Sequence, residues 1–389
     1  MINNDRKIYR ILQKHLDTLP VGYPATRSGV EIRILQRIFT PVQAAVATAL
    51  THRFEPVDRI FETIEKQRRV FLEKPECEAH LDEMAKNGGV FCKTIDGRKH
   101  YALVPFVVGM YEFQVTRLTP GFYEDAARYF REGYALAYLS TAVPQMRVIP
   151  VEQSVGEKQH IATYDEVRRL IADAGERIGV ADCICRKGKD LTGEPCRATD
   201  RRRLCIGLRD YFDTYSRHGW LRQITRDEAM EILSQCETEG LVLQATNEQK
   251  PQAICACCGC CCGVLSTLRH VPNRAEFAAG NFYAKSDPER CVACGKCAER
   301  CHMDAIVLED GKVDIDPKGC IGCGVCVPVC KKGAMALVKR QPETVPPEDT
   351  EALYDTIMAG RKRFAKARTG LKILRHMDMK RLLRAAGSR

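Results

Sequence analysis

Apolar residues recur at helical spacing through the first part of the chain. Five segments show this pattern, and each predicts an amphipathic helix: residues 1–20, 31–39, 42–50, 57–65 and 77–86. Thr40 followed by Pro41 has the residue types that begin a helix. The run Asn87-Gly88-Gly89 has those that end a helix in a left-handed conformation. The N-terminal part of the chain is therefore predicted to be mainly helical.

The pattern becomes strand-like after residue 89. Residues 90–92 and 100–104 flank Asp96-Gly97, a dipeptide that is typical of a tight hairpin turn. Several helices followed by a short hairpin resemble a winged helix-turn-helix domain. We place this domain at residues 1–150.

A winged helix raises the question of DNA binding. The expected recognition helix, residues 77–86, carries three acidic residues and a single lysine, so phosphate would repel it. This composition disfavours nucleic acid as a partner and favours a protein-docking domain or a homodimer. Basic residues 98–100 in the hairpin keep a DNA-binding regulator open as an alternative.

A second domain, residues 151–285, is predicted to contain both helices and strands. Capping boxes that begin at Thr163 and Thr225 each predict a helix, the first of them through residue 177. A strand is expected after each helix, at 178–180 and at 241–245. The residue pattern therefore predicts an α/β middle domain.

Two shorter regions complete the chain. Residues 286–340 include a predicted hairpin, 306–315, that turns at Asp310-Gly311. A proline-rich hinge at 342–347 then leads into a helical tail, so the last region spans 341–389. The fold class predicted for the whole chain is α+β.

Positive charge is concentrated at the C-terminal end. Of the formal net charge of +10 at pH 7, residues 360–389 contribute eleven Lys and Arg against one acid, Asp378. This mixture of cations and apolar residues predicts a tail that binds an anionic membrane surface or an acidic partner protein. The apolar positions of the tail are Phe364, Leu371, Ile373, Leu374, Met377, Leu382 and Leu383.

The 21 cysteines of the chain are clustered, and only Cys77 and Cys92 precede residue 183. A secreted disulfide protein would spread its cysteines along the chain and begin with an apolar signal segment. Residues 1–20 are polar, and no run of about 18 apolar residues occurs that could span a membrane. We therefore expect metal-binding thiols in a reducing cytoplasm.

Two cysteine quartets near the C-terminal end share the spacing C-x2-C-x2-C-x3-C. The second quartet repeats the first after 29 residues. In this spacing three cysteines of one loop bind a [4Fe–4S] cluster, and the fourth binds the neighbouring cluster. Zinc is the weaker alternative because it favours cysteine pairs about 12–20 residues apart. The predicted ligands are Cys291, Cys294, Cys297 and Cys330 for a first cluster, and Cys301, Cys320, Cys323 and Cys326 for a second.

Residues 291–331 resemble a bacterial-type two-cluster ferredoxin, a small fold built from a βαβ repeat. The order of the domains resembles the fused 4Fe–4S dicluster-domain proteins of anaerobic bacteria, which implies a role in anaerobic electron transport. One departure is that His302 and Lys331 follow the fourth cysteines, where the family usually has proline. Both could place positive charge beside a cluster, and we expect Lys331 with Lys332 to raise the potential of the cluster on Cys330.

Ten further cysteines lie in the middle domain. Adjacent thiols cannot all turn into one core and exposed thiols oxidise, so metal ligation explains their density. Ten thiolates could hold two more cubanes with two to spare, while a zinc site, an unusual cluster, or free or redox-paired thiols are alternatives. The candidate ligands are Cys183, Cys185, Cys196, Cys205, Cys255, Cys257, Cys258, Cys260, Cys261 and Cys262.

Two Cys-Cys-Gly steps, at 257–259 and 261–263, are similar to those of heterodisulfide-reductase-type subunits. The wider cysteine spacing of that family is absent, so its clusters and activity are not transferred. Cys77, Cys92 and Cys236 are isolated and expected in the core or at the surface. Nearby cations could offset thiolate charge, dock an acidic partner or be solvated: Arg186, Lys187, Lys189 and Arg201 to Arg203.

These observations predict an iron–sulfur electron carrier or an electron-transfer subunit of an oxidoreductase complex. Its cofactors are two [4Fe–4S] clusters and further clusters or another metal in the middle domain, and its partners are a redox donor and acceptor. No nucleotide-binding glycine loop occurs, and we predict no catalytic residue. The alternatives are a redox-sensing winged-helix regulator and a reductase subunit that acts at the cysteine-rich middle site.

Overall fold

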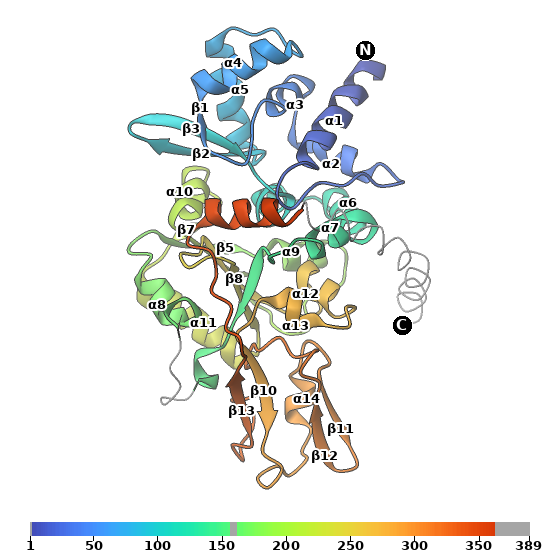
Figure 1. Cartoon of the computed structure of the whole chain (residues 1–389), viewed down its shortest axis with the longest axis vertical. Helices are drawn as coiled ribbons and strands as arrows, with labels where there is room; N and C mark the ends of the chain where they lie inside the picture. Colours follow the sequence, from blue (N-terminus) through green and yellow to red (C-terminus); the bar gives the residue numbers. More distant parts are fainter. Residues whose placement is uncertain (1, 156–161, 362–389) are drawn as a thin grey trace.

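The computed structural model describes residues 2–155 and 162–361, arranged as three parts along one long axis (Figure 1). Helices and a small sheet form one end, a six-stranded sheet lies in the middle, and two short hairpin-like sheets form the other end. Strands and helices both contribute throughout, so the predicted α+β class is confirmed in this general form. Among the described helices, none is long and apolar enough to cross a membrane.

The N-terminal part contains the five helices that the residue pattern predicted. Thr40 caps α3 because its side chain accepts the Gln43 N–H, and the Gln43 side chain accepts in return from the Thr40 N–H. The hairpin turns at Asp96 and Gly97, which both have positive φ, the conformation that the Asp-Gly dipeptide favours. The elements are α1 Ile2–Leu16, α2 Val30–Ile38, α3 Pro41–Ala47, β1 Glu55–Pro56, α4 Val57–Gln67, α5 Lys74–Lys86, β2 Val90–Ile95 and β3 Arg98–Leu103.

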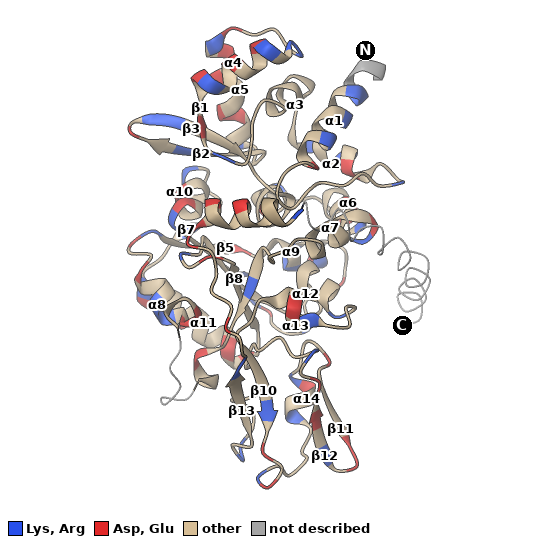
Figure 2. Ribbon diagram, viewed as in Figure 1, with Lys and Arg blue, Asp and Glu red and all other residues tan. Residues whose placement is uncertain are grey.

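Acidic and basic residues are interspersed over all three parts of the described chain (Figure 2). On α5, Asp82 accepts a hydrogen bond from Lys99 of the hairpin at 2.7 Å, and Glu78 lies 3.8 Å from the same amine. These acidic side chains neutralise the lysine that a DNA-binding hairpin would offer to phosphate.

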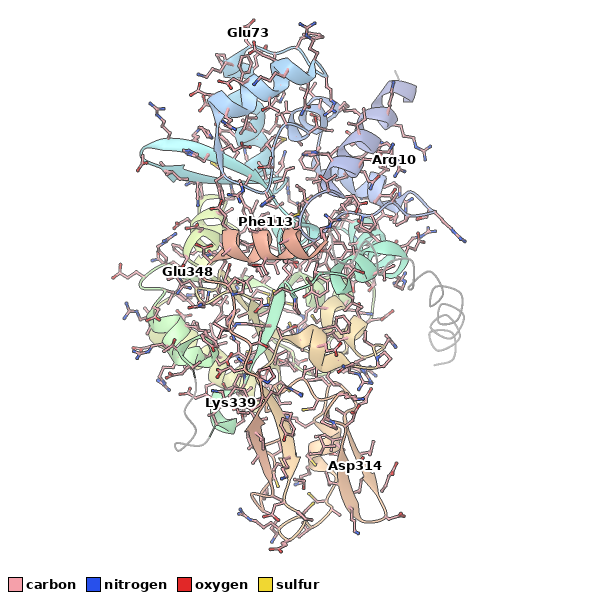
Figure 3. The ribbon with its side chains drawn as sticks, viewed as in Figure 1. Arg10, Glu73, Phe113, Asp314, Lys339 and Glu348 are labelled. Carbon is pink, nitrogen blue, oxygen red and sulfur yellow. The ribbon has the colours of Figure 1, made fainter. Side chains whose placement is uncertain are left out.

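A short linking segment joins the N-terminal part to the middle sheet. Its main helices are α6 Pro120–Tyr129 and α7 Ala135–Leu139. Phe113, labelled in Figure 3, is fully buried here and stacks on Trp220 with the ring centroids 5.1 Å apart. Aromatic packing therefore joins the N-terminal part to the middle sheet.

The middle sheet has the strand order β4-β8-β9-β6-β5-β7, and all its neighbouring strands are antiparallel. It is therefore not the parallel sheet that an α/β arrangement usually implies. Its strands are β4 Met146–Ile149, β5 Ile178–Asp182, β6 Arg203–Leu208, β7 Arg222–Gln223, β8 Val242–Thr246 and β9 Ala253–Cys257. Its helices are α8 Val167–Ala172, α9 Ile184–Leu191, α10 Arg209–Arg217, α11 Arg226–Thr238, α12 Gly263–Leu268 and α13 Arg274–Ala278.

The two predicted capping boxes of this domain have different outcomes. Thr225 accepts the Glu228 N–H and begins α11, as predicted. The long helix predicted from Thr163 is wrong, because residues 163–165 form a 3-10 turn and α8 begins only at Val167. Asp165 is instead buried against Arg147 and accepts a hydrogen bond from Asn281 at 2.8 Å. This buried pair fixes Asp165 in a tertiary contact that a helix starting at Thr163 would not make.

The third part consists of two antiparallel pairs of strands and one short helix. Strand β10 (Phe282–Ser286) pairs with β13 (Met335–Lys339), and β11 (Ile306–Glu309) pairs with β12 (Lys312–Ile315). The second pair is the hairpin predicted at 306–315. Helix α14 (Lys296–Glu299) lies between the first cysteines of the region and this hairpin.

The proline-rich segment is packed against the middle domain rather than free. Gln249 donates hydrogen bonds to the carbonyl oxygens of Pro346 and Pro347, at 3.0 and 2.8 Å. A helix over 350–361 follows and lies between the N-terminal part and the middle sheet (Figure 1). Arg53 pairs with Glu351 and Asp355 of this helix. The predicted basic tail beyond residue 361 lies outside the described residues.

Candidate metal centres

The two cysteine quartets begin in the same local structure. The Cys291 N–H donates to the carbonyl oxygen of Asp287 at 3.0 Å, and the Cys320 N–H donates to that of Asp316 at 2.8 Å. The two contacts are separated by 29 residues, like the quartets themselves. The repeat in the sequence is therefore also a repeat in the fold.

The quartets end in the same way. The Ala305 N–H donates to Cys301 Sγ at 3.4 Å, and the Ala334 N–H donates to Cys330 Sγ at 3.2 Å. Burial acts to raise the pKa of the Cys330 thiol, but several backbone N–H groups outweigh it and lower that pKa. Donors aimed at sulfur stabilise the thiolate, the form that binds iron. These residues fit the thiolate ligands of an iron–sulfur cluster.

The second quartet lies close to the last cysteine of the first. Burial raises the pKa values of Cys301, Cys323 and Cys326, and the charges of neighbouring cysteines in this set add to the effect. Burial likewise raises the pKa of Cys297, and the charges of Cys291 and Cys294 add to the effect. The structure thus brings Cys301 near Cys320, Cys323 and Cys326.

The two sets differ in their exposure to solvent. Cys294 is exposed and the neighbouring Val292 side chain is 59 % exposed, whereas Cys320 and Cys326 are buried. The loop of the first quartet therefore faces solvent, and the loop of the second faces the protein.

Residues 290–334 match the family model of the 4Fe–4S dicluster domain. The match covers both quartets and the two repeated N–H···S contacts. It supports an iron–sulfur, ferredoxin-like domain in this part of the chain, as the cysteine spacing predicted. No curated protein and no solved structure matched the chain.

The iron–sulfur domain packs closely on the middle domain. The Val151 N–H donates to the carbonyl oxygen of Cys323 at 3.0 Å. Gly324 has a φ of +77° and lies so close to Ser154 that a side chain at this position would overlap the serine hydroxyl. This interface therefore lies directly beside a ligand loop of the second quartet.

His302 makes a second connection between these domains. Its Nδ1 accepts the Gly259 N–H at 3.3 Å, and its Nε2 lies 2.8 Å from the carbonyl oxygen of Gly240, to which it donates. Burial lowers the pKa of His302, and an Nδ1 that accepts a hydrogen bond carries no proton. The expected positive charge at residue 302 is therefore wrong, and the neutral ring serves as a docking contact.

The ten middle cysteines separate into two groups because the strands of the sheet alternate their side chains between its faces. Cys255 and Cys257 of β9 and Cys205 of β6 pack into the core shared with the N-terminal part. Cys258 follows directly and packs into the core on the opposite face. The dense cysteine run 255–262 therefore supplies both groups.

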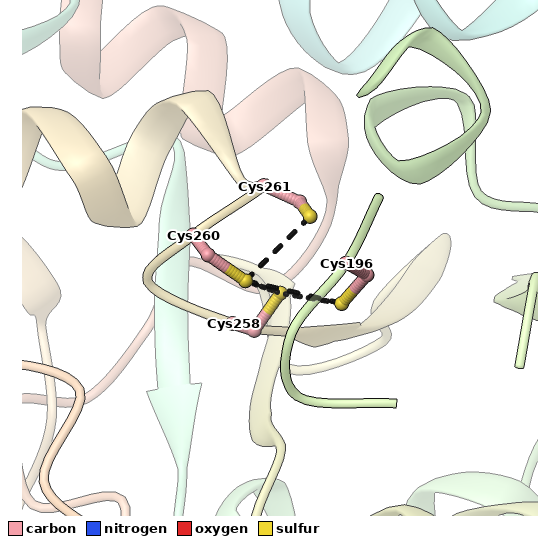
Figure 4. Close-up of side chains that lie close together, drawn as sticks. All are labelled: Cys196, Cys258, Cys260 and Cys261. Atoms are coloured by element: carbon pink, nitrogen blue, oxygen red, sulfur yellow. Dashed lines mark hydrogen bonds between the residues drawn. The ribbon is translucent and has the colours of Figure 1, made fainter. Parts of the chain in front are cut away.

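The four-thiol group consists of Cys196, Cys258, Cys260 and Cys261, whose sulfur atoms all lie within 4.8 Å of one another (Figure 4). Four of the sulfur–sulfur distances are 3.6, 3.9, 3.4 and 3.7 Å. Within the described residues, no second set of three or more metal-binding side chains is this compact. The group is the strongest geometric candidate for a metal site in the middle domain.

Five of the other six thiols pack against the core shared with the N-terminal part. Cys183 interacts with Cys185 and Cys205, and the series continues through Cys255 and Cys257 to Cys262. The charge of Cys262 raises the pKa of Cys185, so the last thiol of the series also interacts with one near its start. We refer to Cys183, Cys185, Cys205, Cys255, Cys257 and Cys262 as the six-thiol ring.

Arg186 lies between the two groups and is 1 % exposed. It donates to the Ala256 carbonyl oxygen at 2.9 Å and to Cys258 Sγ at 3.4 Å. Burial opposes its charge, but the negative charges of Cys183 and Cys258 outweigh burial and raise the pKa of Arg186. In the part of the chain that the structure describes, no carboxylate pairs with it. This buried guanidinium therefore faces sulfur instead of carboxylate, and thiolates bound to a metal would supply its counter-charge.

The other five cations that the sequence singled out in this region pair with acids. Arg201, Arg202 and Arg203 contact Glu239, Asp190 and Asp182, respectively. Lys187 and Lys189 likewise contact Asp182 and Glu194. Arg186 is thus distinguished from its neighbours by its thiolate partners.

Three cysteines lie outside both groups and both quartets. Cys77 and Cys236 are fully buried, and burial raises their pKa values to about 11 and about 12. Cys92 is buried and accepts a hydrogen bond from Arg217 at 3.5 Å. All three are core residues.

Sequence reasoning missed Glu112, whose carboxylate is influenced by the charges of two cysteines of the six-thiol ring. Burial raises the pKa of Glu112 to about 8, and the charges of Cys183 and Cys257 act in the same direction. One carboxylate oxygen accepts the Gly109 N–H at 2.8 Å. Nothing in the local sequence separates this acid from the many on the surface, because only the tertiary fold brings it near cysteines more than 70 residues away.

Proposed function

We propose that this chain is an iron–sulfur electron-transfer protein that carries two [4Fe–4S] clusters. The dicluster-domain match at 290–334, over two quartets with matching N–H···S contacts, is the observation that carries the proposal. Cys291, Cys294, Cys297 and Cys330 hold the first cluster. Cys301, Cys320, Cys323 and Cys326 hold the second. Clusters bound at these cysteines would supply one-electron transfer.

The first quartet would hold its cluster towards a redox partner protein, and the second quartet would hold its cluster towards the middle domain. The exposed loop at Val292 and Cys294 offers access to a redox partner protein. The second cluster faces the middle domain through Cys323 and through His302, which follows its ligand Cys301. Gly259, the hydrogen-bond partner of His302, is two residues from Cys257 of the six-thiol ring.

The six-thiol ring is the acceptor that this route favours. Its sulfur atoms are less compact than those of the four-thiol group, as a cluster of several irons requires. Six thiolates exceed the four that one cubane uses, so the ring suits a larger or bridged cluster. The protein then acts as an electron-transfer subunit, with a donor and an acceptor protein in a reducing cytoplasm.

Anaerobic purification with iron and acid-labile sulfide analysis tests the proposal. Cys294→Ser and Cys323→Ser should each remove or convert one cluster and lower the iron content by up to about four per chain. Cys77→Ser, which changes a buried thiol outside every group, should leave the iron content unchanged. Equal iron and sulfide in all four proteins would reject the assignment.

A reductase that acts at the six-thiol ring is the second candidate. Glu112 favours it because an acid with a pKa of about 8 lies near the ring and could supply a proton when a bound molecule is reduced. Turnover of disulfides with a low-potential dye as donor tests this function. Absence of turnover in iron-replete protein would leave electron transfer as the activity.

A further inference from the structure

The four-thiol group has the dimensions of a site for one metal ion. A tetrahedral metal with metal–sulfur bonds of about 2.3 Å places its sulfur atoms roughly 3.8 Å apart. Four of the sulfur–sulfur distances in this group are 3.4, 3.6, 3.7 and 3.9 Å. In a cubane each thiolate binds a different iron, so the sulfur atoms must lie outside the cube and farther apart.

The quartets of the iron–sulfur domain provide an internal comparison. In the described residues, neither quartet contains three sulfur atoms as close together as those of the four-thiol group. The four-thiol group and the two quartets therefore differ in sulfur–sulfur spacing within a single protein. Among the described residues, no three thiols of the quartets or of the six-thiol ring lie within 4.8 Å of one another.

We propose that Cys196, Cys258, Cys260 and Cys261 bind a single zinc ion in a structural site that is separate from the clusters. Cys196, Cys258 and Cys261 are buried and Cys260 is partly buried, as in closed structural zinc sites. Four thiolates on Zn²⁺ leave a net charge of about −2. Arg186 is buried against Cys258 and supplies compensating positive charge.

The ion would fix the loop that receives the iron–sulfur domain. Three of its ligands lie within residues 258–261, and Gly259 in this loop donates the hydrogen bond to His302. The fourth ligand, Cys196, comes from a separate loop more than 60 residues earlier. A zinc ion would thereby join two loops of the middle domain at the surface on which the iron–sulfur domain docks.

Metal analysis of the full chain, purified without oxygen, tests this inference. The wild type should contain one zinc per chain, and Cys260→Ala should lose that zinc while its iron and sulfide stay unchanged. Cys236→Ala, a matched change at a fully buried thiol in α11, should retain the zinc. Loss of about four irons and four sulfides from Cys260→Ala, with no change in zinc, would overturn the proposal and indicate a cubane.

Zinc-edge X-ray absorption of the wild type is a second test that needs no variant. It should show a single shell of four sulfur atoms at about 2.3 Å. Zinc bound through nitrogen or oxygen atoms would overturn the proposal. Because the iron content of Cys294→Ser and Cys323→Ser is measured separately, failure of the zinc site would not affect the proposed electron transfer.

Discussion

Replacement of Arg186 tests whether thiolates are its counter-ions. At 3.4 Å from Cys258 Sγ, a unit charge pair in a medium with an effective dielectric constant of about 20 is worth about 5 kcal/mol. Desolvation of the guanidinium offsets part of this energy, and hydrogen bonds to charged groups contribute about 1.5–3 kcal/mol net. Arg186→Met should therefore weaken metal binding by the four-thiol group roughly 10- to 150-fold.

Competition with a zinc chelator under anaerobic conditions measures this change as the fraction of zinc that is released. Arg186→Lys keeps the charge but loses the planar donor geometry, so its affinity should fall between those of the wild type and Arg186→Met. Arg201→Met is the matched control because Arg201 is exposed and pairs with Glu239. Urea unfolding, followed by the fluorescence of Trp220, is the control for folding. A variant that unfolds at the wild-type urea midpoint has kept its fold.

Equal zinc affinity in Arg186→Met and Arg201→Met would refute the reasoning. It would mean that the sulfur atoms around Arg186 carry no net negative charge in the folded protein. Metal-bound thiolates would then not be the counter-ions of Arg186, whatever metal the four-thiol group holds.

Three further predictions concern other parts of the fold. Glu248 is fully buried, and burial raises its pKa from 4.5 to about 7. The folded protein therefore binds this proton more tightly than the unfolded chain does. The resulting contribution to stability is complete below pH 4.5 and is lost as the pH rises to about 7. Urea unfolding should show about 3 kcal/mol of this loss in the wild type and none in Glu248→Gln. His302→Pro removes two interdomain hydrogen bonds, together worth about 1–3 kcal/mol, and should speed hydrogen exchange at the Gly259 amide. Lys331→Pro, at the equivalent but exposed position of the second quartet, should leave that exchange rate unchanged. Phe113→Ala should lower the free energy of unfolding by about 3–5 kcal/mol, because the ring is fully buried. Phe71 is 85 % exposed, so a similar loss in Phe71→Ala would show that burial of the Phe113 ring is not the cause.

Local sequence signals predicted the elements whose causes are local. Thr40 and Thr225 begin helices because each accepts a backbone N–H three residues later. The two Asp-Gly turns at 96 and 310 form because this dipeptide tolerates positive φ. The iron–sulfur domain was recognisable for the same reason, since its cysteines lie within short loops of fixed spacing.

Elements with distant causes could not be predicted in this way. The predicted helix begins only at Val167, because Asp165 before it is held in a buried contact with Arg147 and Asn281. The ten middle cysteines could not be divided from spacing alone, because the division depends on the pairing of Cys205 with Cys255 across β6 and β9. Once that pairing is known, Cys257 at the end of β9 and Cys258 directly after it are separated onto opposite faces of the sheet.

The central claim is that the cysteines within residues 290–334 hold two clusters that each carry one electron. Its most direct test is a potentiometric titration of the anaerobic full-length protein, followed by electron paramagnetic resonance. We expect two one-electron steps attributable to this domain, with spectra broadened by interaction between neighbouring reduced clusters. Cys294→Ser should alter one step and Cys323→Ser the other. A protein with its full metal content that gives no paramagnetic signal at any potential would contradict the claim.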